Sequence, residues 1–274
     1  MDRVRKRWPA VLLAFLVILI LWGLHLRSVH HTSSYPATAL PAASMQKEPL
    51  TMLWAWETPE DLTALNPATA GVAFLSREVL LGRTLEIRPR RQPLRLAANT
   101  WLMAVVRIET ASDFISTADT PARIATAIAA AAQQPGVRGI QVDFDATSSQ
   151  RSFYAAVLRQ LRPQLPPNMP LSITALVSWC GDDSWLNKLP VDEAVPMFFR
   201  MGGPATIRTS RPKNASLVHE PLCSGSAGIS TDETWPAIHN RQRVYVFHPG
   251  SWTQQDLARV NALGYQSLKG DSLR

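Results

Sequence analysis

The sequence predicts an α/β fold, a (β/α)8 TIM-like barrel preceded by one N-terminal transmembrane helix. Within residues 51–274, apolar runs of strand length alternate with helical patterns, which is typical of parallel sheets with helical connections. The runs are nearly continuous, as expected for strands buried on both faces. About eight of them fit into this length, close to the roughly 250 residues of a usual barrel. An open doubly wound sheet is the alternative, but its usual glycine-rich loop after the first strand is missing from the sequence.

The N-terminal segment, residues 1–27, is a basic stub followed by a predicted transmembrane anchor. Residues 1–7 contain four Arg and Lys side chains, and residues 8–24 contain no charged side chain. An apolar stretch of about 17 residues lies at the short end of the lengths that span a membrane. The positive-inside rule then places the rest of the chain in the periplasm or outside the cell. A cleaved signal peptide is the alternative, although the cleavable-looking residues 36–44 lie well downstream.

The first half of the folded region is predicted to consist mainly of strands. Residues 28–50 have no apolar period and are expected to form a linker before a barrel domain at 51–274. The predicted strands comprise residues 50–57, 71–81, 84–90 and 100–109. Pro-Glu-Asp at 59–61 indicates a helix start, because proline and acidic residues favour the first helical turn. Residues 121–134 also begin with proline and are predicted to be helical.

In the second half, predicted strands and helices alternate regularly. The strands comprise residues 137–146, 171–180, 193–201, 227–233 and 243–249. The helices comprise residues 149–161, 182–189 and 253–263. The first of these helices carries an apolar face at helical spacing, formed by Phe153, Val157, Leu158 and Leu161. This order indicates a parallel sheet with helices covering it.

Charge and motif content exclude several classes of function. The net charge is +7, but residues 1–27 hold five of the 28 Lys and Arg and one of the 21 Asp and Glu, which leaves 23 − 20 = +3. The densest basic run, residues 88–95, is broken by prolines, so we predict no nucleic-acid binding. His219, His239 and His248 share no close ligand spacing, so we predict no metal. No G-x-S-x-G elbow is present, and no cofactor is predicted.

The chain contains two cysteines, Cys180 and Cys223. In an extracytoplasmic domain such a pair tends to form a disulfide, and we predict one here. Two buried free thiols are the alternative.

Acidic, aromatic and basic side chains gather at the predicted carboxyl ends of the strands, where TIM barrels carry their functional sites. In chain order they are Trp56, Glu57, Arg107, Asp143, Asp145, Trp179, Asp182, Arg200, Asp232, Glu233 and His248. We expect these side chains to meet at one wet rim of the barrel.

Two carboxylates in an aromatic-lined cleft suit glycoside hydrolysis, in which one acid protonates the leaving oxygen and a second group stabilises or attacks the sugar carbon. Asp143 and Asp145 would lie roughly 6.6 Å apart along a strand, and like charges that close raise the pKa of one member. Asp145 with Asp232 or Glu233 is a second candidate pair. In the structural alternative, Asp145 caps the helix that follows, and the tryptophans are core residues rather than sugar platforms.

Seven sequence motifs in this order resemble a bacterial family known as domain of unknown function 3142 (DUF3142). They are LWAWE, VAFLSR, VRGIQVDFDA, SITALVSWC, DEAVPMFFRMG, GISTDE and VYVFHP, spread over residues 50–252. The resemblance supports the boundaries of the barrel domain.

The segment GIQVDFDA is also similar to the fourth-strand motif D-G-x-D-x-D-x-E of chitinase-type family 18 glycoside hydrolases. Asp143 matches the last aspartate, and Asp145 stands where that family has its catalytic glutamate. Gln141 and Arg138 replace the two other aspartates, and PMFFRMG has a phenylalanine where the family has a tyrosine that helps to hold the acetamido group. The resemblance implies a sugar substrate. The shorter Asp145 side chain leaves open a binding protein that has lost catalysis.

The residues and the resemblances together predict a glycoside hydrolase-like protein anchored in the cytoplasmic membrane, acting on an extracytoplasmic polysaccharide. Asp145 is the expected general acid and Asp143 its partner, with Asp232 or Glu233 as second carboxylate. The other candidates at the rim would bind the substrate, with Trp56 and Trp179 as sugar platforms. The alternative is a non-catalytic carbohydrate-binding or envelope scaffold protein.

Overall fold

A computed structural model describes residue 45 and residues 47–181, 185–200, 218–233 and 242–271, with the backbone alone for 263–271. The chain divides into two units, Met1–Ala37 and Thr38–Arg274, and all described residues belong to the second. The predicted anchor at 8–24 lies outside the described residues. Among the described helices, none is both long and apolar enough to span a membrane.

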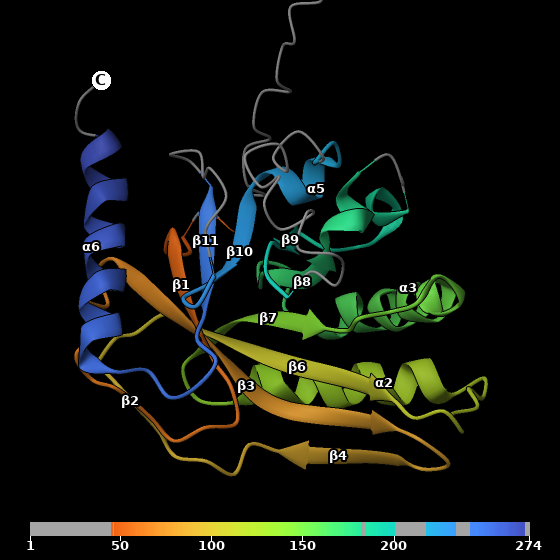
Figure 1. Ribbon diagram of the computed structural model, residues 1–274. Helices are drawn as coiled ribbons and strands as arrows, with labels where there is room; N and C mark the ends of the chain where they lie inside the picture. Colours follow the sequence, from red (N-terminus) through yellow and green to blue (C-terminus); the bar gives the residue numbers. More distant parts are fainter. Residues whose placement is uncertain (1–44, 46, 182–184, 201–217, 234–241, 272–274) are drawn as a thin grey trace, which may run out of the picture. The chain divides into compact units, whose positions relative to one another are not determined.

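Eight parallel strands close into a TIM-like barrel (Figure 1), which confirms the barrel part of the predicted fold class. In order around the barrel they are β1 (Thr51–Ala55), β3 (Ala70–Leu81), β6 (Leu102–Thr110), β7 (Val137–Asp143), β8 (Leu171–Leu176), β9 (Glu193–Met197), β10 (Ser226–Ser230) and β11 (Arg243–Phe247). Closure is completed by β1, which pairs in parallel with both β11 and β3.

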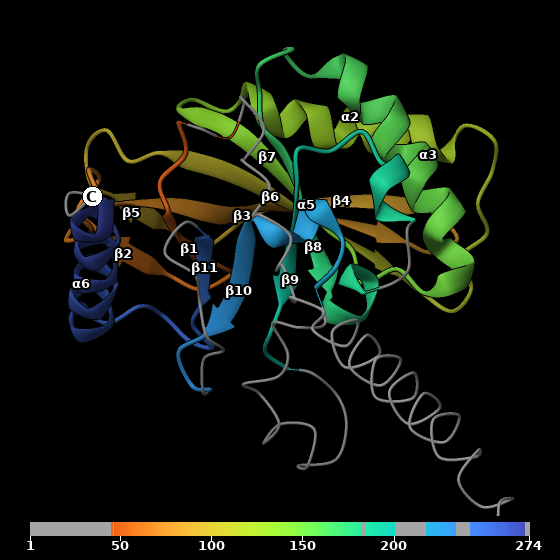
Figure 2. The same ribbon diagram turned by 90° about the horizontal axis from the view of Figure 1, so that it is seen from above.

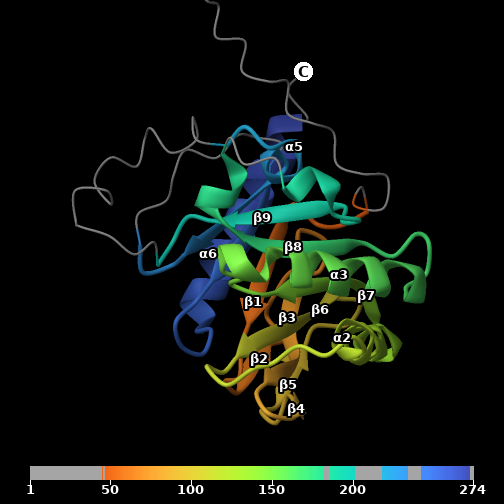
Figure 3. The same ribbon diagram turned by 90° about the vertical axis from the view of Figure 1, so that its right-hand side faces the viewer.

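Three apolar clusters follow from the alternation of side chains along these strands. Inside the barrel, Trp54, Met103 and Tyr245 belong to one cluster. Outside, α2 (Thr120–Ala129) and α3 (Arg151–Leu161) pack side by side against β6 and β7 (Figure 3). The C-terminal helix α6 (Gln254–Asp271) covers the opposite side, near β1 and β3 (Figure 2).

The helix predicted to start at residues 59–61 is absent. Within this described part of the chain, neither the connection from β1 to β3 nor that from β3 to β6 contains a helix. Instead β2 (Glu60–Leu62) pairs in parallel with β5 (Leu94–Leu96). The Glu60 carboxylate accepts hydrogen bonds from Thr58 and from the backbone N–H of Trp252. Tertiary pairing therefore overrides the local helix-start signal.

The strand β3 extends well beyond the barrel rim. β1 pairs with β3 only as far as Phe74, and β4 (Leu85–Pro89) then takes the same edge of β3 in antiparallel pairing from Arg77 to Leu81 (Figure 1). The pairing of β3 with β6 shifts register between Leu75 and Arg77, just after the last residue of β3 that pairs with β1. The extension of β3 and β6, with β4 at its edge, thus forms an open sheet beside the mouth of the barrel.

Short helices complete the described structure. They are η2 (Ala130–Gln133), η3 (Ser148–Gln150), η4 (Arg162–Gln164), η5 (Val177–Cys180), η6 (Leu186–Lys188) and α5 (Pro221–Ser224). The strand predicted over 171–180 ends at Leu176, where η5 turns the chain. Of the helix predicted over 182–189, only the η6 turn is found, and residues 182–184 lie outside the described residues.

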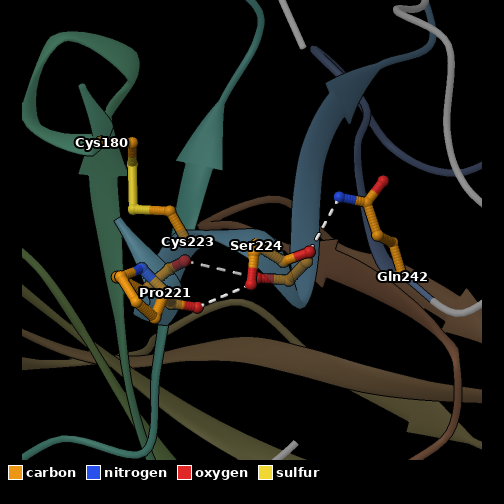
Figure 4. Close-up of a disulfide and its surroundings, with 7 residues drawn as sticks. Cys180, Pro221, Cys223, Ser224 and Gln242 are labelled. Carbon is orange, nitrogen blue, oxygen red and sulfur yellow. Dashed lines mark hydrogen bonds between the residues drawn. A yellow bond between two sulfur atoms is a disulfide. The ribbon is translucent and has the colours of Figure 1, made fainter. Parts of the chain in front are cut away.

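Cys180 and Cys223 form a disulfide that joins the end of η5 to α5 (Figure 4). The backbone carbonyl of Cys180 also accepts the N–H groups of His219 and Glu220. On the other side of α5, Gln242 donates a hydrogen bond to the carbonyl of Ser224. The disulfide therefore closes a long loop on a site that is already well anchored.

Replacing both cysteines by alanine is expected to lower the free energy of unfolding by about 4 kcal/mol, because the bridge closes a loop with a sequence separation of 43 residues. Urea unfolding of the oxidised protein and of the double variant measures the difference. The wild type in reductant serves as the control and should match the variant. A loss below about 1 kcal/mol would show that the bridge contributes little.

A buried polar network closes the barrel at the amino-terminal ends of its strands. Arg243 donates to Glu193 (2.7 Å), to the carbonyl of Met45 (2.7 Å) and to that of Pro49 (3.0 Å). The end of the predicted linker is thus packed into the barrel domain, with Glu48 only 5% exposed. The barrel domain therefore includes residues before the predicted start at 51.

The Tyr245 hydroxyl lies 2.9 Å from Glu48 Oε1 and 2.8 Å from Glu193 Oε2. A hydroxyl has one proton to donate, so two such contacts require a proton on one of the carboxyl groups. Burial raises the pKa of Glu48 to about 8, against the opposing effect of Arg243. Glu48 is accordingly the protonated partner at neutral pH.

Wild-type stability is expected to fall as pH rises from about 4.5 to about 8. Over that window the folded protein keeps a proton on Glu48 that the unfolded chain releases. Each pH unit therefore lowers the contribution of this group to the free energy of unfolding by about 1.4 kcal/mol. Glu48→Gln removes this titration while keeping a side chain that can bond Tyr245. In urea unfolding at pH 5, 6, 7 and 8, the free energy of unfolding of the variant should increase with pH relative to that of the wild type. A constant difference would contradict the assignment of the proton.

Candidate functional site

A cavity of about 810 Å³ lies at the carboxyl ends of the barrel strands. Two acids, Asp143 and Asp145, and two arginines, Arg107 and Arg200, line it. Its aromatic lining comprises Trp54, Trp56, Phe199 and Phe247. The strand ends of a closed parallel barrel converge here, so side chains far apart in sequence meet at one opening.

Asp143 is the last residue of β7 and is only 4% exposed. Its Oδ1 accepts a hydrogen bond from Thr174 (2.7 Å), and its Oδ2 is paired with Arg107 (3.1 Å). Burial raises the pKa of Asp143, while Arg107 and Thr174 counteract the rise and Asp145 adds to it. The prediction of a wet rim is therefore wrong for Asp143, whose burial is compensated by two partners.

Asp145 is exposed and lies two residues beyond the end of β7. Within the described chain its carboxylate accepts no hydrogen bond, and it lines the cavity. The helix cap that might have engaged it is made by Thr147, which forms a capping box with Gln150. Asp145 is thus free to meet a ligand, and the capping alternative does not hold.

Arg107, at the cavity wall, is engaged by protein groups on three sides. It pairs with Asp143 and with Glu109 (2.7 Å), and its guanidinium lies 5.7 Å from the centre of the Trp56 ring. These contacts fix the orientation of both Asp143 and Trp56. Arg107 was predicted to bind substrate, and the structure shows it first as a residue that positions other cavity groups.

The aromatic rings form one continuous wall. Phe199 and Phe247 are stacked with centroids 5.3 Å apart, and Trp56 meets Phe247 edge-on at 6.3 Å. Trp54 continues the wall below Phe199, with ring centroids 5.9 Å apart. Aromatic faces of this kind suit the apolar faces of sugar rings. The sequence also indicates Trp54, Phe199 and Phe247 at or near strand ends, but we assigned them no binding role from it.

Gln141 anchors Trp54 from inside the barrel. The indole N–H of Trp54 donates to Gln141 Oε1 (2.7 Å), and Gln141 Nε2 donates to Ser172 (3.1 Å). An aspartate carboxylate could not donate to Ser172 in this way. The glutamine that replaces the aspartate of the resembled motif therefore supports the floor of the cavity in an uncharged form.

Arg90 is a supporting residue that sequence reasoning missed. Its guanidinium donates to the carbonyls of Ala55, Trp56 and Thr58, just after β1. The Glu57 carboxylate, predicted to bind substrate, instead accepts the backbone N–H groups of residues 91 and 92. Both contacts tie the end of β1 to the chain after β4, and they hold Trp56 in the cavity wall.

Asp232 and Glu233 are held by Arg200 at the edge of the cavity. Arg200 Nη2 is 2.7 Å from Asp232, and its backbone N–H and guanidinium both reach Glu233. The hydrogen bond from Ser230, together with Arg200, lowers the pKa of Asp232. Neither acid lines the cavity. Their predicted role as second carboxylate is therefore not supported by this geometry.

Arg200 has a positive backbone φ of 53°, an uncommon conformation for a residue other than glycine. Such a conformation costs on the order of 1 kcal/mol and needs support from its surroundings. The bond of 3.0 Å from its N–H to Glu233 supplies that support.

Two further predicted site residues, Trp179 and His248, do not line the cavity. Trp179 is 3% exposed and packs edge-on against Trp185 in the core, so it offers no sugar platform. His248 bonds the backbone of Gly250 and lies 3.4 Å from Asp256. Asp182 lies outside the described residues.

In the described part of the chain, no group of three or more His, Cys, Asp or Glu side chains is arranged to hold a metal ion. The site as described therefore consists of one free carboxylate, one partly buried ion pair and an aromatic wall.

The family described as "Domain of unknown function (DUF3142)" matches residues 99–196, from β6 to β9. The matched segment contains Arg107, Asp143, Asp145 and Thr174, and it confirms the resemblance over this central part of the chain. No curated protein is significantly similar in sequence.

Among solved structures, a protein assigned as chitinase A from Streptomyces coelicolor is similar with a TM-score of 0.54 at 10% identity, covering 80% of this chain and 98% of that one. An endo-beta-N-acetylglucosaminidase from Cordyceps militaris gives 0.48 at 9% identity, covering 82% and 92%. The Bacillus cereus spore cortex-lytic enzyme SleL gives 0.44 at 19% identity, covering 66% and 51%. The likeness to the Streptomyces coelicolor structure shows a shared barrel fold.

Proposed function

We propose that this protein is a glycoside hydrolase that acts on an extracytoplasmic polysaccharide, with Asp145 as its general acid. The observation that carries the proposal is the free carboxylate of Asp145 at an aromatic-walled cavity. Such a cavity offers stacking surfaces for a sugar ring and one unpaired acid at its edge. Asp145 follows β7, the fourth strand of the barrel, by two residues, which supports the proposal.

In the proposed reaction, Asp145 in its protonated form delivers a proton to the oxygen of the scissile glycosidic bond. Positive charge then develops on the sugar ring, as in other glycoside hydrolases. Asp143 supplies negative charge nearby, but both of its oxygens are already bonded by Arg107 and Thr174. We assign it charge stabilisation and orientation rather than nucleophilic attack. The attacking group is then water or a neighbouring group of the substrate itself.

A non-catalytic carbohydrate-binding protein is the second candidate function. One observation favours it: Asp145 is the sole free carboxylate among the described cavity residues, and it is one methylene shorter than the glutamate of the resembled motif. Proton delivery requires an approach of about 2.6–3.2 Å, which a shorter side chain attains only if the sugar lies deeper. The aromatic wall would serve binding equally well without turnover.

We also propose that residues 8–24 anchor the protein in the cytoplasmic membrane with its barrel outside the cytoplasm. The charge pattern around this segment supports the orientation. The Cys180–Cys223 disulfide supports it independently, since such bonds persist in oxidising compartments. Protease digestion of intact spheroplasts should remove the barrel, whereas a barrel protected until lysis would contradict the proposal.

Hydrolysis and binding are distinguished by exposing the full-length protein to a panel of bacterial envelope polysaccharides and measuring both bound ligand and released reducing ends. Release supports hydrolysis, and binding without release supports the second candidate. Trp56→Ala removes part of the aromatic wall and should weaken either activity. Ile115→Ala is the matched control, because Ile115 is an apolar side chain 82% exposed outside the cavity. Equal effects of both variants would place the ligand elsewhere.

A further inference from the structure

The inner face of the barrel continues beyond its rim onto the open sheet formed by β3, β4 and β6. Met103 and Val105 point into the barrel, so Arg107 and Glu109 on the same strand continue that face outward. On β3, Val79 and Leu81 pack toward α2 and α3, which leaves Glu78 and Leu80 on the opposite, open face. β1 pairs with β3 only as far as Phe74, and Glu78 and Leu80 are partly exposed.

A row of alternating charge crosses four adjacent strands on this face. Arg88 of β4 pairs in register with Glu78 of β3, Glu78 with Arg107 of β6, and Arg107 with Asp143 of β7. Register partners on neighbouring strands point to the same side of a sheet, about 4.8 Å apart. The row therefore presents a guanidinium, a carboxylate, a guanidinium and a carboxylate at regular intervals, with no net charge.

A second row lies one step farther along the strands. Glu86 pairs in register with Leu80, and Leu80 pairs with Glu109. We define the shelf as the six open-face residues of these two rows on β3, β4 and β6: Glu78, Leu80, Glu86, Arg88, Arg107 and Glu109. All of them are exposed or partly exposed. Exposed ion pairs contribute only about 0–1 kcal/mol to stability, so folding alone does not account for this arrangement.

The shelf is continuous with the cavity. Arg107, Asp143 and Asp145 line the 810 Å³ cavity and also a second hollow of about 260 Å³. That second hollow extends to Glu109 and Thr110, which brings it onto the shelf. A ligand that fills the cavity and is longer than one sugar unit can therefore pass Asp145 and continue across the shelf.

We propose that the shelf binds the part of a neutral polysaccharide chain that extends beyond the sugar unit in the cavity. Sugar hydroxyl groups both donate and accept hydrogen bonds, so they match the first row, in which charged donors alternate with charged acceptors. The spacing between strands is comparable to the length of one pyranose unit, so successive units meet successive strands. A polymer with charge of a single sign would meet a like charge at every second strand.

The inference rests on the proposed function and refines it. The substrate would be a long, uncharged glycan bound on both sides of Asp145, rather than a single terminal sugar. Affinity should then increase with chain length until the shelf is filled.

The test compares oligosaccharides of increasing length, prepared from a neutral polysaccharide that the full-length protein binds, by isothermal titration calorimetry. We expect the longest oligosaccharides to bind at least about tenfold more tightly than the shortest. The double variant Glu78→Ala with Arg88→Ala removes one acid and one base from the shelf without touching the cavity. This variant should bind long oligosaccharides no more tightly than short ones, and it should bind the shortest with the affinity of the wild type.

The double variant Arg123→Ala with Asp119→Ala is the matched control, since it removes an exposed ion pair at α2, which packs against the opposite face of the sheet. Length-independent binding by the wild type, or a full length effect in the shelf variant, would overturn the inference while leaving the proposed function intact. The inference would also be overturned if the wild type bound no neutral glycan and bound short and long charged glycans equally tightly. Failure to bind any glycan would overturn both.

Discussion

Replacing Asp145 by asparagine is expected to abolish glycan hydrolysis while the protein remains folded. A positioned general acid contributes about 10²–10⁴-fold to the rate, and asparagine cannot deliver the proton. Because the carboxylate is exposed and unbonded within the described chain, its loss should change the free energy of unfolding by less than about 0.5 kcal/mol. Reducing-end release and urea unfolding measure the two quantities on the same preparation.

The control for this experiment is Asp113→Asn, which changes an exposed aspartate that pairs with Arg83 outside the cavity lining. It should retain wild-type turnover. If Asp145→Asn releases reducing ends at the wild-type rate, Asp145 is not the acid. If it unfolds instead, the residue has a structural role.

Replacing Arg243 by methionine is expected to lower the free energy of unfolding by about 3–5 kcal/mol at pH 7. Among the described residues, its guanidinium is the one cation within ion-pair distance of both Glu48 (3.6 Å) and Glu193 (2.7 Å). Without it, Glu193 is a buried charge with no opposite charge, and such a charge is strongly unfavourable. Two carbonyls near the start of the barrel domain also lose their donor.

Urea unfolding measures this loss, and Arg83→Met provides the control, because Arg83 is an exposed arginine whose removal should cost less than about 1 kcal/mol. Should the methionine variant fail to fold, Arg243→Lys keeps the charge but loses the geometry that reaches several acceptors, and it should fold with intermediate stability. Equal stability of both Arg243 variants and the wild type would contradict the role of this network.

Much of the barrel was predictable because its strands are long apolar runs with strong periodic signals. The connections from β1 to β3 and from β3 to β6 were not, because Glu60–Leu62 acquires strand structure only by pairing with Leu94–Leu96, more than thirty residues away. A short segment with proline and acidic residues favours a helix start by local rules, and only the distant partner decides otherwise.

The candidate site was predictable where the side chain stands close to the end of a strand. Asp143, Asp145 and Trp56 meet in the cavity because they stand at or just after the ends of β7 and β1. Arg107 joins them from within β6, which continues to Thr110. Trp179 does not, because β8 ends at Leu176, earlier than its apolar sequence suggests, and the η5 turn carries the indole into the core.

The sequence by itself determined the parallel barrel, the pair of acids at the fourth strand and the cysteine pair, because each depends on periodicity, spacing or composition. Only the tertiary structure decided which acid is free. Spacing alone does not show which of Asp143 and Asp145 is bonded by the protein, yet Arg107 and Thr174, from neighbouring strands, bind the first and leave the second exposed. Charge compensation depends on contacts across strands, and the spacing along one strand does not contain that information.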